Sequence, residues 1–378
     1  MRFQFSHQGR RAVVATAAAV AMATLAACSN PQGVGGDGQE TGEDAAMPSQ
    51  VTMVIPYDVG GGTDIWARFM APYLEKHVEG NPTFIPENIP GGESITGSNQ
   101  FVASGGTDGS QILVTSGTTY FQALLDRPEV EFDFTKMQPL MLNGTGGVIY
   151  ASSASGIKSL EDLKDPPEPL VYGGISATGL DLSLLQAFDV LGVDVDPTFG
   201  FEGRGPAALA LARGETNIDY QTTAAYLTEV KPLVESGEAV PLMSFGVLED
   251  GEIVRDPNVP DLPTVEEAYE QLNGSPPEGE AYDAYRAFLV PGYVYQKGIW
   301  ADEDTPDSIV QAYRDAVVPI TEDPEFKKSS EEVLGGYPLY SGEDAQDDLI
   351  EAFQIKPEIR QYTIDLLKNT YDTTIDGS

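Results

Sequence analysis

The sequence predicts an α/β protein of two domains with a mainly parallel sheet. Short β-rich runs alternate along the chain with runs of helical periodicity, an order that places helices between neighbouring parallel strands. Glycine-rich turns separate several strands from the helices that follow them. The 378 residues suffice for two domains of ~100–200 residues each, and a hydrophobic content of 41% supplies sizeable cores.

The first domain is expected to begin with a strand, a glycine turn and a helix. Residues 51–55 are β-rich, glycines 60–62 turn the chain, and Thr63 and Asp64 begin the helix. The run 148–151 is interpreted as a strand that passes into the second domain. Between these points we predict strands at 83–86 and 111–115 and helices at 95–103 and 120–125.

The rest of the chain continues the alternation. Strands are predicted at residues 170–172, 198–201, 218–220, 240–245 and 287–290. Helices are predicted at residues 180–191, 206–213, 224–236, 265–271, 307–320, 324–334 and 344–363. Several prolines and acids between residues 246 and 277 indicate a surface excursion that contains the helix at 265–271.

The N-terminal segment has the order of an export signal. Residues 1–27 carry three arginines, then an apolar run of about 16 residues, which is shorter than the ~20 that a membrane span needs. Cys28 follows Leu-Ala-Ala, a match to the lipobox of bacterial lipoproteins, so we predict that Cys28 is lipidated. An ordinary secretory signal is the alternative, and Arg10 with Arg11 leaves twin-arginine export open. Residues 28–49 have the composition of a flexible tether.

The composition excludes several classes of function. With 59 acidic and 21 basic residues the net charge is −38, which opposes binding to nucleic acid. The single cysteine excludes an intramolecular disulfide. His77 is the one histidine after the signal, and a lone helical histidine is more often a surface residue than a base. We find no catalytic set and no metal or cofactor motif, so none of these is expected.

Two glycine turns that lead into helices are candidates for ligand contacts. The turn at 60–62 lacks a Walker lysine, but unpaired backbone N–H groups at such a turn favour a carboxylate. The alternative is a plain turn in which Asp64 caps the helix and pairs with Arg68. The second turn, at 173–179, brings the hydroxyls of Ser176 and Thr178 before a helix. Facing each other across a cleft, the two turns would grip a dicarboxylate.

A third turn, at 201–206, contains Arg204, and arginine is scarce in this acidic chain. A guanidinium can hold a carboxylate through two parallel hydrogen bonds. Under this hypothesis, Arg204→Ala leaves the stability of the unliganded protein nearly unchanged and weakens carboxylate binding at least ~10-fold. The alternative is a surface arginine paired with Glu202.

Six motifs follow one another in the order found in a known family. Residues 54–68 resemble the family's V-P-F-x-x-G-G-x-x-D-x-x-A-R opening, and residues 88–97 resemble N-x-P-G-A-G-G-x-x-G. The other four motifs are matched at residues 107–116, 172–182, 201–206 and 262–267. Together they cover nearly all of residues 50–370, and the chain resembles the solute receptors of tripartite tricarboxylate transporters, also called Bug- or TctC-type receptors.

This resemblance implies an α/β, two-lobed periplasmic-binding-protein fold (type II-like), with two parallel or mixed sheets flanked by helices and a ligand cleft between the lobes. It implies one lobe of residues 50–147 with 282–378 and a second of residues 148–281. Together with the lipobox at Cys28, it predicts an extracytoplasmic lipoprotein on the outer face of the cell membrane. Such a receptor captures a small di- or tricarboxylate and delivers it to membrane permease subunits, and we expect a monomer.

The turns and the resemblance together give a set of candidate ligand-binding residues. They are Tyr57, Gly60, Gly61, Gly62, Thr63, Asp64, Ser116, Gly117, Gly174, Ser176, Ala177, Thr178, Gly179, Phe201, Gly203, Arg204 and Gln221. The chain departs from the family pattern in four places: Asp181 replaces a histidine, Gln221 and Thr222 replace an acid–asparagine pair, Arg204 replaces a small residue, and the excursion at 246–286 is longer.

Two other functions stay open at this point. A receptor that presents its closed form to a sensor kinase would use the same cleft. An α/β hydrolase or transferase built on glycine loops is the alternative from another class, and the missing general base disfavours it.

Overall fold

The computed structural model describes residues 45–249 and 251–375, all within one compact unit. The predicted export signal, the predicted lipidation site Cys28 and residues 28–44 of the predicted tether lie outside the described residues. Within the described ranges, every helix is too short or too polar to cross a membrane.

In the described chain, six strands form a first sheet in the order β13-β4-β12-β3-β1-β2. Their bounds are β1 (Gln50–Ile55), β2 (Thr83–Asn88), β3 (Gln111–Thr115), β4 (Gln138–Asn143), β12 (Lys297–Ala301) and β13 (Leu339–Ser341). β1 is parallel to β2 and β3, whereas β12 is antiparallel to β3 and β4. The sheet is therefore mixed rather than mainly parallel, because β12 returns from far along the chain in the opposite direction.

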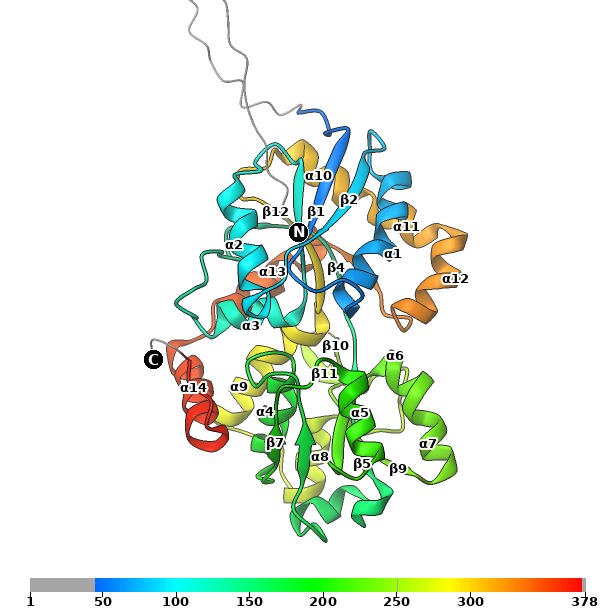
Figure 1. Ribbon diagram of the computed structural model, residues 1–378, viewed down its shortest axis with the longest axis vertical. Coiled ribbons are helices and arrows are strands. Elements are labelled where there is room, and N and C mark those ends of the chain that lie inside the picture. The colour runs from blue at the N-terminus through cyan, green and yellow to red at the C-terminus, as the bar shows by residue number, and fades with distance from the viewer. Residues whose placement is uncertain (1–44, 250, 376–378) are drawn as a thin grey trace, which may run out of the picture. The chain divides into compact units, whose positions relative to one another are not determined.

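Helices cover both faces of this sheet (Figure 1). One face carries α1 (Gly62–His77), α10 (Asp307–Asp315), α11 (Val317–Glu322) and α12 (Pro324–Val333), and the other carries α2 (Ile95–Ser104), α3 (Gly117–Leu124) and α13 (Gly342–Phe353). Along β1, Val51 and Met53 enter one core while Val54 enters the other. This alternation follows from the two-residue period of a strand that is buried on both faces.

The second sheet has the order β7-β6-β8-β5-β9 and is also mixed. Its strands are β5 (Gly147–Ser152), β6 (Val171–Gly173), β7 (Asp196–Thr198), β8 (Ile218–Thr222) and β9 (Ala239–Ser244). β6 is parallel to β7 and β8, and β5 is antiparallel to β8 and β9. The helices around it are α4 (Asp181–Leu191), α5 (Arg204–Ala212), α6 (Thr223–Ala225), α7 (Lys231–Ser236), α8 (Val265–Asn273) and α9 (Glu280–Leu289).

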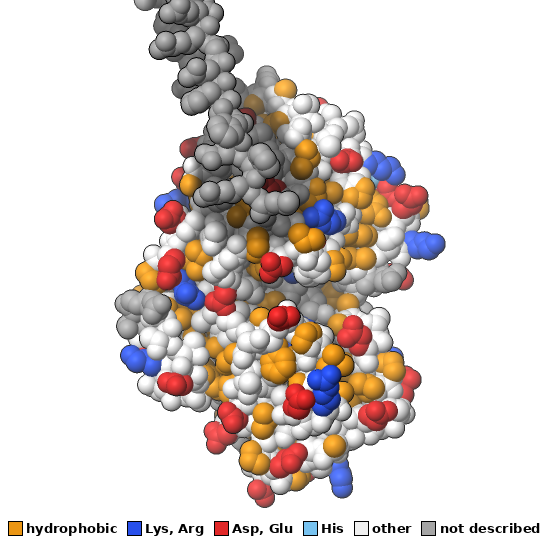
Figure 2. All heavy atoms as spheres, in the orientation of Figure 1, with side chains coloured by type: hydrophobic (Ala, Val, Ile, Leu, Met, Phe, Trp, Pro, Cys, Tyr) orange, Lys and Arg blue, Asp and Glu red, His pale blue; other side chains and the backbone are white. Residues whose placement is uncertain are grey.

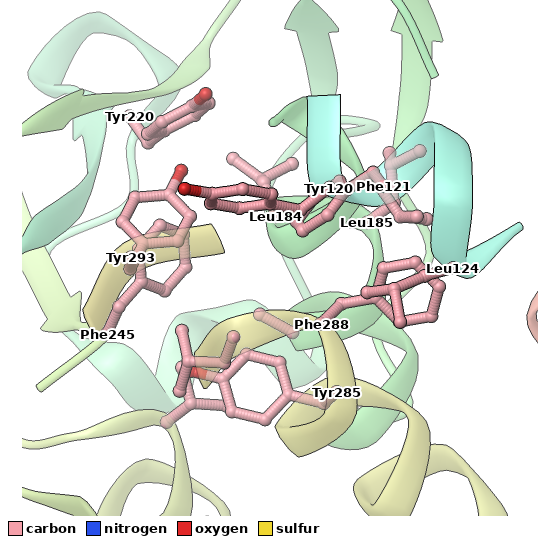
Figure 3. Close-up of a cluster of buried hydrophobic side chains, with 14 of the residues drawn as sticks. Tyr120, Phe121, Leu124, Leu184, Leu185, Tyr220, Phe245, Tyr285, Phe288 and Tyr293 are labelled. Atoms are coloured by element: carbon pink, nitrogen blue, oxygen red, sulfur yellow. The ribbon is translucent and has the colours of Figure 1, made fainter. Parts of the chain in front are cut away.

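We call the first sheet with its helices lobe 1 and the second sheet with its helices lobe 2. A single hydrophobic cluster runs from one lobe to the other (Figure 3). Phe121 of α3 meets Phe288 of α9 with ring centroids 5.0 Å apart, and Leu184 and Leu185 of α4 belong to the same cluster. The described lobes are therefore joined by packed side chains as well as by the chain.

The C-terminal helix α14 (Pro357–Tyr371) contacts both lobes. Arg360 donates a hydrogen bond to the Leu124 carbonyl of α3 (2.7 Å), and Tyr362 donates one to Asp189 of α4 (2.7 Å). The lobe limits implied by the resemblance stay a prediction, and the limit between residues 281 and 282 falls inside α9.

Several local expectations were wrong. Residues 287–290, expected as a strand, end α9 and begin a π-helical turn, Val290–Val294. The apolar run there belongs to a helical face, since Tyr285, Phe288 and Leu289 are all buried. The helix expected at 344–363 divides into α13 and α14, and Pro357 begins the second.

Other strands were unexpected or displaced. Strands β4, β12 and β13 were not foreseen. The expected strand at 198–201 lies earlier, as β7, and the excursion also holds a hairpin of β10 (Val247–Glu249) and β11 (Glu252–Val254).

Candidate functional site

A cavity of about 420 Å³ lies between the lobes. Lobe 1 contributes the loops after β1 and β2 and the start of α3, and lobe 2 contributes the turn before α4, the start of α5 and the end of β8. The lining residues are Pro56, Tyr57, Asp58, Pro90, Gly91, Glu93, Ser94, Thr118, Ile175, Ser176, Gly179, Leu180, Asp181, Arg204, Tyr220, Thr222 and Tyr293. The volume is within the range that binds small molecules, ~300–1,000 Å³.

Four of the candidate residues from the sequence line this interlobe cavity: Tyr57, Ser176, Gly179 and Arg204. The others do not line it, namely Gly60, Gly61, Gly62, Thr63, Asp64, Ser116, Gly117, Gly174, Ala177, Thr178, Phe201, Gly203 and Gln221. Most of them lie in the turns that carry the lining residues.

Gly117 has a packing role that its sequence position did not reveal. A Cβ atom at this position would lie 2.6 Å from a methyl carbon of Leu180 and 2.7 Å from the Gly292 carbonyl oxygen. The start of α3 therefore approaches Leu180, the residue before α4, so closely that only glycine fits between them.

In the first turn, at residues 60–62, the backbone donates a hydrogen bond to the side chain of Asp64, which follows it in the chain. The buried Asp64 carboxylate accepts hydrogen bonds from the Gly60 backbone N–H (2.8 Å), Arg68 Nε (2.9 Å) and Asn88 Nδ2 (2.9 Å). Burial raises the pKa of Asp64, but the hydrogen bonds from Arg68, Gly60 and Asn88 outweigh it and hold the pKa below its ordinary value. Asp64 thus takes one of the backbone donors, the Gly60 N–H, for which a ligand carboxylate was expected at this turn.

In the second turn, at residues 173–179, the backbone likewise donates hydrogen bonds to an aspartate side chain, that of Asp181. Its carboxylate accepts hydrogen bonds from the backbone N–H groups of Ile175 (2.6 Å) and Ser176 (2.9 Å), and also from the Tyr172 hydroxyl. The Thr178 N–H donates to Ser176 Oγ (3.3 Å). Three N–H groups of this turn, those of Ile175, Ser176 and Thr178, are therefore already taken by the protein's own acceptors.

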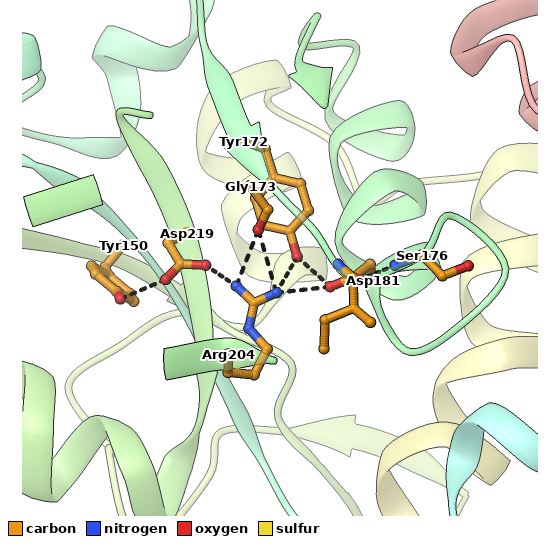
Figure 4. Close-up of polar contacts among 8 residues, drawn as sticks. Tyr150, Tyr172, Gly173, Ser176, Asp181, Arg204 and Asp219 are labelled. Carbon is orange, nitrogen blue, oxygen red and sulfur yellow. Dashed lines mark hydrogen bonds and ion pairs between the residues drawn. The ribbon is translucent and has the colours of Figure 1, made fainter. Parts of the chain in front are cut away.

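Arg204 is held between two carboxylates of lobe 2 (Figure 4). Its Nη1 donates to Asp181 (2.9 Å) and to the Tyr172 hydroxyl (2.8 Å), and its Nη2 donates to Asp219. Both Nη atoms also lie 3.4 Å from the Gly173 carbonyl oxygen. The guanidinium lies 4.5 Å from the centroid of the Tyr220 ring. Its Nη donors are thus taken by the protein itself.

Asp219 belongs to the same cluster and has a shifted pKa. Its carboxylate also accepts a hydrogen bond from the Tyr150 hydroxyl (2.8 Å). Burial raises the pKa of Asp219 to about 6, against the opposing pull of Arg204. The side chain of Arg204 is only 19% exposed and pairs with Asp181 and Asp219. The alternative of a surface pair with Glu202 is wrong. The expectation that Arg204→Ala leaves the stability of the unliganded protein nearly unchanged stays a prediction, and the two buried carboxylate partners of Arg204 argue for a loss of stability instead.

The loop after β2 was not foreseen as part of the site. Four consecutive residues adopt positive φ angles: Gly91 (136°), Gly92 (55°), Glu93 (54°) and Ser94 (82°). Two of them are not glycine, and such a conformation costs on the order of 1–3 kcal/mol per residue. Strain of this kind is concentrated at functional sites, and the Asn88–Gly92 motif of the resemblance pointed to this loop.

Glu93 connects this loop to lobe 2. Its carboxylate accepts a hydrogen bond from Thr178 Oγ1 (2.5 Å) and one from Arg127 (3.2 Å). In the same region, Gln122 Nε2 of α3 donates to the Thr178 carbonyl (2.9 Å). The side of the cavity at Glu93 is therefore formed by a direct polar contact between the lobes.

Lys297 of β12 is a further polar group that the sequence did not single out. Its Nζ donates to Thr63 Oγ1 at the start of α1 (2.8 Å). Burial lowers the pKa of Lys297 to about 7. Lys297 does not line the interlobe cavity, so its amine is not a ligand contact there.

Three solved structures illustrate what this chain is similar to in fold. A TctC solute-binding protein from Polaromonas has a TM-score of 0.60 at 19% identity, over 85% of this chain and 99% of the other. MatC from Rhodopseudomonas palustris with bound malate has a TM-score of 0.55 at 20% identity, over 83% and 97%. R. palustris Rpa4515 with adipate has a TM-score of 0.54 at 22% identity, over 85% and 97%.

No family model and no curated protein matches the chain. At 19–22% identity these likenesses show the fold. The expected α/β architecture, a two-lobed periplasmic-binding-protein fold with mixed sheets flanked by helices, is confirmed.

Proposed function

We propose that this protein is an extracytoplasmic solute-binding receptor that captures a small carboxylate between its lobes without chemically changing it. The observation that carries the proposal is the interlobe cavity, which both lobes line and which has the volume of a small-molecule site. The fold supports it, because two solved structures with this fold hold malate and adipate. Thr118 and Ser176 supply hydroxyl groups at the cavity that can donate to a carboxylate.

We further propose that Cys28 anchors the protein to the outer face of the cell membrane and that the closed receptor delivers its solute to permease subunits. The lipobox supports the anchor. Acidic side chains are scattered over the face that Figure 2 shows, and basic side chains do not gather there into a patch. That surface suits an extracytoplasmic receptor better than a partner of nucleic acid.

Binding is tested by thermal unfolding of the purified protein with mono-, di- and tricarboxylates and their amino derivatives. A ligand at 100 times its dissociation constant adds ~2.7 kcal/mol to the stability. Recovery of the unchanged solute is the second expected result, and a chemically altered solute would point to an enzyme instead.

The anchor is tested by expression in a host that processes lipoproteins. The parent should fractionate with membranes and Cys28→Ser should not, because three acyl chains hold firmly where none does. A Cys28→Ser protein that stays bound to membranes would refute the anchor and leave solute binding unaffected.

A further inference from the structure

We propose that Asp256 links lobe 1 to lobe 2 and limits how far the lobes separate when no solute is bound. Asp256 lies in the excursion at 246–286, which is longer than in the family pattern and to which the proposed function gives no role. Such a link restricts the movement of the lobes whichever solute binds between them.

The Asp256 carboxylate is buried and accepts hydrogen bonds from both lobes. The residue is 0% exposed. Its Oδ2 accepts from Thr223 Oγ1 (2.8 Å) and from the Tyr337 hydroxyl, and its Oδ1 accepts from the Asn258 backbone N–H (2.9 Å). A buried carboxylate is costly unless it is hydrogen-bonded, so each of these donors helps to hold it. We call the hydrogen bond from Tyr337 to Asp256 the interlobe brace.

Tyr337 belongs to lobe 1, in the loop between α12 and β13. Its carbonyl and the Pro338 carbonyl accept hydrogen bonds from Asn143 Nδ2 of β4 (3.3 Å and 3.0 Å). Burial and the charge of Asp256 raise the pKa of the Tyr337 hydroxyl above its ordinary value. The hydroxyl therefore keeps the proton that it donates to Asp256.

Asp256 and Thr223 both belong to lobe 2. Asp256 follows β11, and its carbonyl accepts a hydrogen bond from the Val259 N–H (3.0 Å). Val259 is buried in a hydrophobic cluster with Val148 of β5, and Thr223 begins α6 directly after β8. The hydrogen bond from Thr223 thus stays within lobe 2, whereas the interlobe brace connects the two lobes.

The interlobe brace lies beside the segments in which the chain crosses between the lobes. Residues 144–146 join β4 to β5, and residues 290–296 join α9 to β12. The Thr145 N–H donates to the Tyr293 carbonyl (2.8 Å), so the two crossings lie side by side. A Cβ atom at Gly146 would collide with the side-chain oxygens that form the brace, so only glycine lets the crossing pass so close.

The interlobe brace joins the lobes at a second place, apart from the aromatic cluster. Helices α3 and α9, which carry the contact between Phe121 and Phe288, lie on the left of Figure 1, and α6 lies on the right. A Cβ atom at Gly335, two residues before Tyr337, would lie 2.9 Å from the Ala224 side chain of α6. Without the brace, the lobes would be held together less tightly on the side of α6.

The test measures the distance between the lobes in the absence of solute. Spin labels are attached to Lys328→Cys on α12 and Glu235→Cys on α7, two exposed positions, in the full chain with Cys28→Ser. Pulsed electron paramagnetic resonance then gives the distribution of distances between the labels. Tyr337→Phe removes only the hydroxyl of the brace, so it should shift the equilibrium toward separated lobes at least ~10-fold and give a longer, broader distribution.

Thr223→Val is the matched control, because it removes a hydroxyl that donates to the same oxygen of Asp256 from within lobe 2. It should lower the stability to denaturant about as much as Tyr337→Phe does, but leave the distance distribution unchanged. Asp256→Ala removes the acceptor itself and should broaden the distribution as Tyr337→Phe does. It therefore decides the matter if Tyr337→Phe does not fold.

The distance distributions uphold or overturn the interlobe brace. Broadening in Tyr337→Phe and Asp256→Ala but not in Thr223→Val would uphold it. An unchanged distribution in the first two variants would overturn it, and so would equal broadening in Thr223→Val, because the lobes would then respond to any lost donor. Since no solute takes part, either of these results would leave the proposed function untouched.

Discussion

The two glycine turns have the same design but lie in different surroundings. In each, an aspartate in the first turn of a helix folds back onto the N–H groups of the turn and pairs with an arginine. At Asp64 the partner Arg68 is four residues away on the same helix and its side chain is 46% exposed. At Asp181 the partner Arg204 comes from another helix, is 19% exposed and also pairs with Asp219.

This difference shows that the contribution of an ion pair to folding stability depends more on its burial than on the residue types that form it. An exposed pair is screened by water and contributes little, whereas removing one member of a buried pair leaves a charge without compensation. The second turn and Asp181 also line the interlobe cavity, as does the partner Arg204, while Asp64 does not. Four measurements test this difference between the turns.

The largest effect is expected for Arg204→Ala. The substitution leaves Asp181 and Asp219 buried without their shared cation, which should cost about 3–5 kcal/mol of unfolding free energy at pH 7. Denaturant titration measures it. A loss below ~1 kcal/mol would mean that the cluster behaves like an exposed pair.

The next effect concerns the pH dependence at Asp219. Its folded pKa of about 6 lies above the ordinary 3.8, so the folded state holds the proton more tightly than the unfolded state. The contribution of Asp219 to stability is therefore fully present below pH 3.8 and is lost as the pH rises to 6. Relative to Asp219→Asn, the parent should lose up to ~3 kcal/mol across this window. Parallel denaturant titrations from pH 4 to 7 test it, and a constant difference would contradict the assignment.

The contribution of Asp64, at the first turn, to stability should depend on pH in the opposite direction. Asp64 has a folded pKa below its ordinary value, so its contribution is present above pH 3.8 and is lost as the pH falls through the folded pKa. Asp64→Asn should cost ~1–3 kcal/mol at pH 7, because hydrogen bonds to a charged acceptor are lost. The difference from the parent should shrink in acid, and a difference that grew there would reverse the sign argued for this turn.

The smallest effect is expected for Arg68→Ala, the matched control for Arg204→Ala. Because Arg68 is nearly half exposed, its removal should cost only ~0–1 kcal/mol, and added salt should reduce the cost further. Thermal or denaturant unfolding at low and high ionic strength measures both. A cost equal to that of Arg204→Ala would remove the distinction between the turns.

Local patterns in the sequence were enough for much of the fold. The strand, glycine turn and helix around residues 51–77 follow from side-chain periodicity and turn chemistry, which act over a few residues. The strand misplaced at 287–290 and the unforeseen β12 have the opposite cause. A short apolar run fits a helix face or a strand equally well, and the pairing of β12 with β3 and β4 depends on segments more than 150 residues away.

For the candidate site, the residue order alone showed which turns and which aspartates are present, and it identified several of the segments that line the cavity, though not the loop after β2. The three-dimensional arrangement was needed to show that Asp64 and Asp181 accept hydrogen bonds from their own turns and that Arg204 lies between Asp181 and Asp219, 23 and 15 residues away. It also placed Glu93 against Thr178 across the two lobes. The physical reason is that burial and charge pairing depend on which distant residues share a low-dielectric space, and a linear pattern of residue types does not record that proximity.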